Sequence, residues 1–208
     1  MQLKAKFLLT AAAVVSTLTT SSVMAQAKEQ FIGLPSYRVG AYAAGGSGIY
    51  GGWIDYMAMI NERDGGVNGV KIAWEECETE YNNARGVECY ERLKSKGGSG
   101  NSVFMPLSTG ITYSVLDKVA QDKIPMVTIG YGRTDATDGR VFPWVFPLLT
   151  NYWSQNTAKI KFIGSREGGM DKLKGKKIAL VYHDSPFGKE PIPLMQERAK
   201  MHGFELQM

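Results

Sequence analysis

Residues 70–129 read VKIAWEECETEYNNARGVECYERLKSKGGSGNSVFMPLSTGITYSVLDKVAQDKIPMVTI. Short apolar runs alternate there with longer amphipathic segments. The apolar runs predict three strands, at 70–74, 102–107 and 124–129. The amphipathic segments predict two helices, at 83–96 and 112–122. Because strands that alternate with helices of roughly 10–15 residues are typical of βαβ units, the stretch predicts an α/β fold with a doubly wound parallel sheet.

The alternation continues on both sides of this stretch. Upstream we expect a strand, a glycine-rich loop and a helix, at 31–34, 40–52 and 53–61. Downstream, Pro143 and Pro147 exclude a helix or a central strand, so residues 142–149 are expected to form an extended crossing segment. Beyond it we expect a helix, a loop, a strand, a helix and a last strand, at 151–162, 164–169, 176–182, 189–202 and 204–207. These last elements are too few to bury a core of their own. Either they pack onto the first sheet or, as we expect, the chain is the N-terminal part of a longer protein.

The first 27 residues have the features of a secretory signal peptide. Lys4 and Lys6 precede an apolar run from Phe7 to Leu18, and small residues up to Ala27 offer cleavage sites. The apolar run is shorter than the ~20 residues that span a bilayer. We therefore expect export and removal of this segment.

Charge and cysteine content narrow the class of protein further. The 208 residues include 24 Lys and Arg against 20 Asp and Glu, and two of the basic residues lie in the leader. The remaining surplus is too small to indicate nucleic-acid binding. Cys77 and Cys89 are the only cysteines. In an oxidising compartment they are expected to form a disulfide; a metal site is the alternative, but His183 and His202 are far away in the sequence.

Gly46 to Gly51 match the G-x-G-x-x-G pattern of dinucleotide-binding loops. That chemistry needs the first glycine directly after a strand, whereas eleven residues separate Leu34 from Gly46. The loop is instead expected to form one lip of a ligand site, where the amides of Gly51 and Gly52 hold a polar group at a helix N-terminus beside Tyr50.

Two further loops follow predicted strands at their carboxyl ends. These are Leu107-Ser108-Thr109-Gly110 and Ile129-Gly130-Tyr131-Gly132. Ligands of open α/β sheets bind at that edge, although capping of the next helix by Ser108 or Thr109 explains the first loop equally well. His183-Asp184-Ser185 has the residue types of a catalytic triad, but adjacency does not supply triad geometry; a turn capped by Asp184 or Ser185 is expected. The sequence offers no credible catalytic set.

The order of several motifs resembles one family. These are Ile32-Gly33-Leu34, Tyr50-Gly51-Gly52, Met59-Ile60-Asn61 before Gly65-Gly66-Val67-Asn68-Gly69, and Ile178 to Asp184 followed by Phe187-Gly188. The chain resembles the exported substrate-binding proteins of ABC transporters, in the branched-chain amino acid and amide class. The resemblance implies two doubly wound lobes of the type I, Venus-flytrap kind, which close on one ligand by hinge motion. Residues 28–149 would be the ligand-binding N-terminal lobe and residues 150–208 the beginning of the second, incomplete lobe.

The resemblance also implies the ligand-binding residues and partners. Carried over by position, they are Tyr50, Leu107, Ser108, Thr109, Gly130, Tyr131, Gly132 and Phe187. The ligand would be a small polar molecule, an amino acid, an amide or an aromatic acid. Because Tyr131 makes its loop bulkier than is usual in leucine binders, we expect a ligand other than leucine.

The resulting expectation is a periplasmic binding protein that delivers its ligand to a membrane ABC permease. It would use no cofactor, metal or nucleic acid, would be no enzyme, and would be monomeric when complete. Two alternatives remain: an exported nucleotide-dependent enzyme that uses Gly46–Gly51, and a non-functional fragment of a binding protein.

Overall fold

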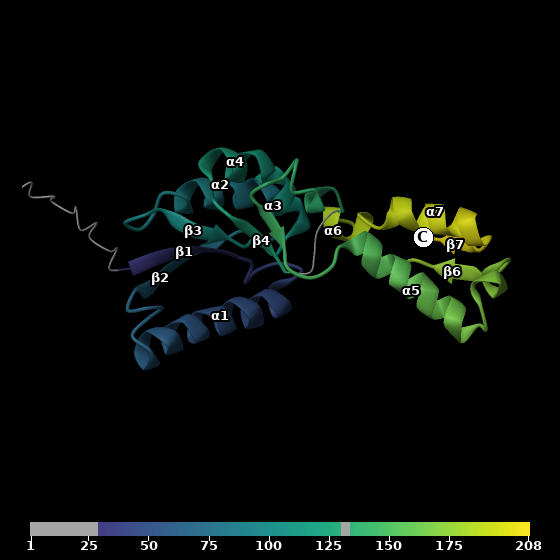
Figure 1. Ribbon diagram of the computed structural model, residues 1–208, viewed down its shortest axis with the longest axis horizontal. Helices are drawn as coiled ribbons and strands as arrows, with labels where there is room; N and C mark the ends of the chain where they lie inside the picture. Colours follow the sequence, from purple (N-terminus) through teal and green to yellow (C-terminus); the bar gives the residue numbers. More distant parts are fainter. Residues whose placement is uncertain (1–28, 130–133) are drawn as a thin grey trace, which may run out of the picture.

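A five-stranded parallel sheet forms the N-terminal part of the computed structural model, which describes residues 29–129 and 134–208 (Figure 1). Its strand order is β2-β1-β3-β4-β5. The strands are β1 (Glu29–Ser36), β2 (Lys71–Glu78), β3 (Asn101–Phe104), β4 (Met126–Thr128) and β5 (Val145–Pro147). The expected signal peptide and the site residues Gly130, Tyr131 and Gly132 lie outside the described residues.

Helices cover both faces of this sheet, as a doubly wound fold requires. One face carries α1 (Ala43–Arg63), and the other carries α2 (Asn83–Leu93), α3 (Thr109–Ser114) and α4 (Leu116–Asp122) (Figure 1). Beneath α1 the core contains Leu34, Tyr50 and Met57. On the opposite face, Phe104 and Met126 of the strands pack among side chains of α2, α3 and α4. The predicted α/β class and parallel sheet are confirmed.

The crossing segment ends the first lobe. Its β5 pairs with β4 in parallel and occupies the edge of the sheet, where Pro147 removes no ladder hydrogen bond from the interior. A short 3-10 helix, η1 (Thr134–Thr137), lies between β4 and β5. The expected crossing segment is therefore an edge strand for part of its length.

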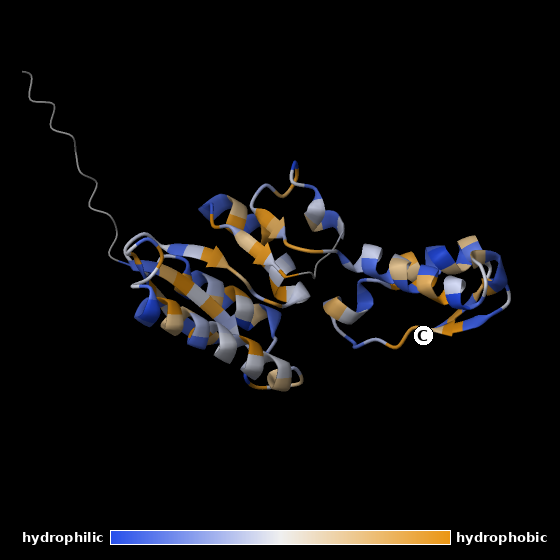
Figure 2. Ribbon diagram, turned by 60° about the horizontal axis from the view of Figure 1, so that its bottom comes forward, coloured by the Kyte–Doolittle hydropathy of each residue, from blue (hydrophilic) through white to orange (hydrophobic). Residues whose placement is uncertain are grey.

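The second lobe has a small core of its own, so the expectation that its elements are too few to bury one is wrong. It contains α5 (Tyr152–Arg166), η2 (Met170–Leu173), β6 (Lys177–Ala179), α6 (Pro186–Lys189), α7 (Ile192–His202) and β7 (Glu205–Gln207). β6 and β7 form a separate two-stranded parallel sheet. Ile160, Leu173, Met195 and Phe204 are buried between that sheet and the helices. In Figure 2 this lobe extends the long axis of the molecule beyond the first.

Some element boundaries differ from the prediction. The loop expected over 40–52 is wrong, because α1 begins at Ala43 and contains the whole G-x-G-x-x-G pattern. Gly46 allows this by lying against Tyr37, where a Cβ would come within 2.0 Å of the Tyr37 carbonyl oxygen. Helix α5 likewise continues to Arg166, into the loop expected over 164–169. Close tertiary packing outweighs the weak helix propensity of glycine.

Two other predicted helices are each divided in the structure. The helix expected over 112–122 begins at Thr109 and breaks at Val115, and the helix expected over 189–202 is separated at Pro191 into α6 and α7. The disulfide between Cys77 and Cys89 is confirmed, with 5.6 Å between the Cα atoms. It joins the end of β2 to α2 and removes both thiols from consideration as metal ligands. Among residues 29–129 and 134–208, no helix has the length and apolar character needed to cross a membrane.

Candidate functional site

A cavity of about 140 Å³ lies where the carboxyl edge of the first sheet meets the second lobe. Both lobes contribute to it, from the segments after β1, β2 and β3, from α1, and from the starts of α5 and α6. The side chains that line it are phenolic, aromatic or aliphatic, and they are Tyr37, Tyr42, Ile49, Tyr81, Leu107, Tyr152 and Phe187. None of these described lining residues carries a charge at neutral pH.

Tyr42 is the centre of the aromatic contacts in this cavity. Its ring centroid lies 4.2 Å from that of Tyr81, at an interplanar angle of 35°. Across the junction it lies 5.0 Å from His183 and 6.4 Å from Phe187, both of the second lobe. Phe187 in turn lies 5.5 Å from Tyr152. Ring contacts therefore connect the two lobes on one side of the cavity.

Hydrogen bonds fix most of the phenol groups. The Tyr37 hydroxyl donates to the Leu107 carbonyl at 3.4 Å, and the hydroxyls of Tyr152 and Thr109 are 3.0 Å apart. Burial raises the pKa of Tyr81 to about 12, helped by Tyr42 and opposed by a hydrogen bond with Ser108. Burial also raises the pKa of Tyr152 well above its ordinary value. Tyr81 and Tyr152 are thus neutral hydrogen-bonding groups at physiological pH.

Backbone strain is concentrated at the same strand ends. Tyr81 has φ +58° and Leu107 has φ +45°, in the left-handed region that large side chains rarely adopt. Such conformations cost about 1–3 kcal/mol and persist where the surrounding structure holds them. Both residues line the cavity, so the strain serves to direct their side chains into it.

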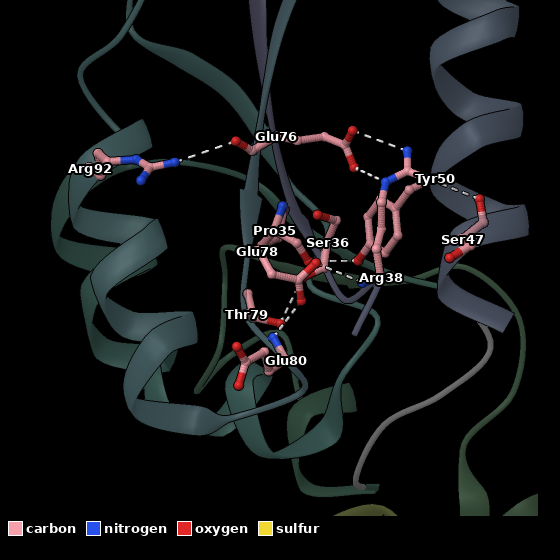
Figure 3. A network of polar contacts seen from close by, with 10 residues as sticks. All are labelled: Pro35, Ser36, Arg38, Ser47, Tyr50, Glu76, Glu78, Thr79, Glu80 and Arg92. Atoms are coloured by element: carbon pink, nitrogen blue, oxygen red, sulfur yellow. Dashed lines mark hydrogen bonds and ion pairs between the residues drawn. The ribbon is translucent and has the colours of Figure 1, made fainter. Parts of the chain in front are cut away.

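Arg38 holds the segment that carries Tyr37 and Tyr42 (Figure 3). Its guanidinium donates to both carboxylate oxygens of Glu76, at 2.6 and 3.0 Å, and to the Ser47 carbonyl at 3.1 Å. Its backbone N–H donates to Glu78 at 2.7 Å. These bonds tie the loop after β1 to β2 and to α1, and so determine where the two tyrosines lie.

Three glutamates at or just after the end of β2, Glu75, Glu76 and Glu80, form ion pairs. Besides the Arg38–Glu76 pair, Lys96 bonds Glu75 at 2.5 Å and Arg85 bonds Glu80 at 2.7 Å. Arg92 also donates to the Glu76 carbonyl. Basic side chains of the loop after β1 and of α2 thus reach the carboxylates at this end of β2.

The structure brings some of the expected site residues to the cavity and places others behind it. Leu107 and Phe187 line it. Ser108 and Thr109 are buried behind it, where Ser108 caps α3 and both hydroxyls bond tyrosines of the lining. Tyr50 is fully buried, its hydroxyl donates to the Pro35 carbonyl at 2.8 Å, and its ring contacts Tyr37 edge-on.

The interpretation of residues 40–52 as a loop feeding a helix N-terminus is consequently wrong. Gly51 and Gly52 lie inside α1, whose N–H groups are bonded along the helix except in its first turn. Those amides are not available to a ligand. The same placement removes the phosphate-binding loop that the dinucleotide interpretation required.

Sequence reasoning missed the tyrosines that dominate the cavity. Tyr37, Tyr42 and Tyr81 each follow a predicted strand, and Tyr152 begins the first helix after the crossing segment. The available signal was the presence of tyrosines just beyond two strand ends, Tyr37 and Tyr42 after β1 and Tyr81 after β2. Each is also consistent with an ordinary core position, which is why the pattern alone did not single them out.

A second hollow, of about 410 Å³, lies beside the junction. Its lining carries charges of both signs and comprises Tyr113, Asp135, Trp153, Pro186, Lys189, Glu190 and Pro193. It is formed largely by residues of α3, η1, α5, α6 and α7. Nearby, Ser185 caps α6 by accepting from the Gly188 amide, and Asp184 pairs with Lys189. The His183-Asp184-Ser185 segment is thus the turn that the sequence predicted.

Comparisons with known proteins agree with this geometry. A protein from the Pseudomonas fluorescens group, described as an ABC transporter permease, is 45% identical with a TM-score of 0.72. A branched-chain amino acid ABC transporter protein from Thermus thermophilus with bound valine is 24% identical with a TM-score of 0.73. A solute-binding protein from R. palustris in complex with 4-hydroxybenzoate is 17% identical with a TM-score of 0.64 and shows the shared fold.

Each of these structures matches 86% of this chain, and the matched part is 44%, 44% and 47% of their own chains. The chain thus spans less than half the length of the solved structures it matches. No curated protein matches the chain. The family model described as "Periplasmic binding protein" matches residues 29–207. With a parallel sheet, two lobes and a cavity between them, the chain belongs to the periplasmic binding protein family.

Proposed function

We propose that this chain supplies the ligand-binding region of an exported solute-binding protein, which delivers a small molecule to the permease of an ABC importer. The observation that carries the proposal is the cavity between the lobes, lined by strand-end residues of the first lobe and by Phe187 of the second. Closure of two lobes on a ligand needs contacts from both. The leader-like first 27 residues support a periplasmic location.

The proposed ligand is a small molecule of the three expected kinds: an amino acid, an amide or an aromatic acid. Solved relatives support more than one of these, since one holds valine and another 4-hydroxybenzoate. We assign no catalytic step to the cavity, because its lining consists of neutral phenols, Leu107, Ile49 and Phe187. Tyr81 and Tyr152, whose pKa values are raised by burial, are poor general acids and bases near pH 7.

Thermal unfolding of residues 28–208 in the presence of candidate ligands tests this proposal. A ligand at 100 times its dissociation constant stabilises the folded state by about 2.7 kcal/mol, which is enough to raise the melting temperature visibly. We expect amino acids, amides or aromatic acids, but not NADH, to produce such a rise.

The matched variants are Phe187→Ala and Phe162→Ala. Phe187 lines the cavity, whereas Phe162 lies on α5 and is 66% exposed. The first variant is expected to lose the ligand-induced rise and the second to keep it. A cooperative melt that no compound shifts contradicts the proposal and favours the non-functional fragment.

A further inference from the structure

We infer that the ligand of the cavity is a planar aromatic molecule with an oxygen that hydrogen-bonds the Tyr42 hydroxyl, and that it places no ammonium group there. This inference rests on the proposed function and narrows it to one class of solute. Three independent features of the lining support it: its charge, the shape of its walls, and one unused hydroxyl.

The charge of the described lining disfavours contact with an ammonium group. An ammonium group loses its hydration in a cavity and needs an acidic partner there. The described lining has no carboxylate. The nearby carboxylates at the end of β2 already have partners, since Glu76 pairs with Arg38 and Glu80 with Arg85. A neutral ligand group therefore suits this lining better than an ammonium group does.

The walls of the cavity suit a flat ring. Tyr37 and Tyr81 stand at 89° to one another with 5.2 Å between their centroids, and the Tyr42 ring is tilted by 35° to that of Tyr81. Tyr152 and Phe187 close the side formed by the second lobe. Such walls offer both faces and edges, and aromatic pairs gain stacking and edge-to-face contacts that an aliphatic chain cannot make.

The Tyr42 hydroxyl indicates that the ligand carries a group that can form a hydrogen bond. It is buried and has no hydrogen-bond partner among the described residues. The hydroxyls of Tyr37 and Tyr152 have partners in Leu107 and Thr109, and that of Tyr81 is bonded by Ser108. A buried hydroxyl without a partner is costly, so an oxygen of the ligand is the group that would complete Tyr42.

Phenol and toluene form a probe pair that tests the inference, because they have nearly the same shape and differ in one hydroxyl. Their binding to residues 28–208 is measured by titration, followed by NMR of the probe, with L-leucine and L-valine alongside. We expect phenol to bind three- to ten-fold more tightly than toluene, which is the range for one buried hydrogen bond. Both aromatic probes are expected to bind more tightly than the aliphatic amino acids.

Tyr42→Phe removes only the unused hydroxyl, and is expected to reduce the phenol-to-toluene ratio to less than about two-fold. The control is Tyr56→Phe, at a tyrosine of α1 that is 60% exposed, which should leave the ratio unchanged. Thermal melts of both variants confirm that they fold.

Tighter binding of leucine or valine than of phenol overturns the inference and leaves the proposed function standing. So does an unchanged ratio in Tyr42→Phe, or a ligand-induced rise in the melting temperature with non-aromatic compounds alone. If no small molecule of any class binds, both the inference and the proposed function fail.

Discussion

At the scale of single residues, the Tyr50 hydroxyl has a structural role that a conservative variant isolates. It donates to the Pro35 carbonyl at 2.8 Å and lies 3.3 Å from the Pro106 carbonyl, in a fully buried position. Tyr50→Phe leaves these acceptors without that donor, and the free energy of unfolding should fall by about 1–2 kcal/mol. Urea denaturation measures the loss, with the exposed Tyr56→Phe expected to stay within about 0.5 kcal/mol. Weaker ligand binding at unchanged stability would instead make Tyr50 a ligand contact, as the family resemblance implies.

Tyr81 gives a prediction about alkaline pH. Its pKa is about 12 in the folded chain because of burial, whereas an unfolded tyrosine titrates near pH 10. The folded state therefore retains a proton that the unfolded state has lost, and stability falls as pH rises from about 10 to about 12. Below about pH 10 this group contributes no pH dependence. The free energies of unfolding of the wild type and of Tyr81→Phe, measured by denaturation across that range, should converge as pH rises. A constant difference between them would contradict the raised pKa of Tyr81 in the folded chain.

The site residues show how far single residues could be predicted. Leu107 and Phe187, two of the residues proposed to bind the ligand, line the cavity, because chain order places them at a strand end and at the first turn of a second-lobe helix. Tyr81 and Tyr42 were not predicted. The direction of Tyr81 depends on its positive φ, and that of Tyr42 on contacts with the second lobe. Neither of these properties leaves a periodic pattern in the sequence.

At the scale of elements, an added Cβ is expected to have opposite effects on stability at two glycines of α1, Gly46 and Gly48. A Cβ at Gly46 would lie 2.0 Å from the Tyr37 carbonyl oxygen and 2.4 Å from its ring, whereas a Cβ at Gly48 would meet nothing within 4 Å. Gly46→Ala should lower the free energy of unfolding by about 1–3 kcal/mol through overpacking. Gly48→Ala should stabilise it by about 0.5–1 kcal/mol, since alanine is the better helix former. Destabilisation by Gly48→Ala in the same denaturation assay would contradict an α1 that begins at Ala43.

The disulfide between Cys77 and Cys89 links β2 to α2. Cys77 and Cys89 are twelve residues apart, and closing so short a loop stabilises by about 3 kcal/mol in the chain-entropy model. The double variant Cys77→Ser, Cys89→Ser should lose about this much in urea denaturation. Adding a reductant should destabilise the wild type to a similar extent and leave the double variant unchanged. A reductant effect on the double variant would show a cause other than this bond.

The elements also show why the strands were easier to predict than the start of α1. β1 and β4 lie in the interior of the sheet, and their apolar segments tolerate few alternatives once they are buried between helices. Residues 43–52 contain five glycines, which local propensity assigns to a loop. Their helical state depends on the contact between Gly46 and Tyr37, two segments that only the folded chain brings together.

At the scale of the whole molecule, the two lobes differ in how well they cover their own sheets. The first sheet has helices on both faces, whereas β6 and β7 form a two-stranded sheet with a small core. A two-stranded sheet is only marginally stable without further packing. The junction between the lobes, formed by Tyr42, His183, Tyr152 and Phe187, therefore contributes to the order of the second lobe as well as to the cavity.

The open edge of the second sheet leads to a prediction about self-association. Val181 follows β6 and is 95% exposed, and an exposed apolar strand edge is a template for pairing with another copy. In sedimentation velocity, the average mass of Val181→Lys should rise less with protein concentration than that of the wild type, because charge on an edge disfavours such pairing. The control is Val67→Lys, at a valine outside both sheets that is 57% exposed, which makes the same change of charge. Equal association of the two variants would mean that contact between copies does not use this edge, and a wild type that stays monomeric at every concentration would mean that the edge is protected within the chain.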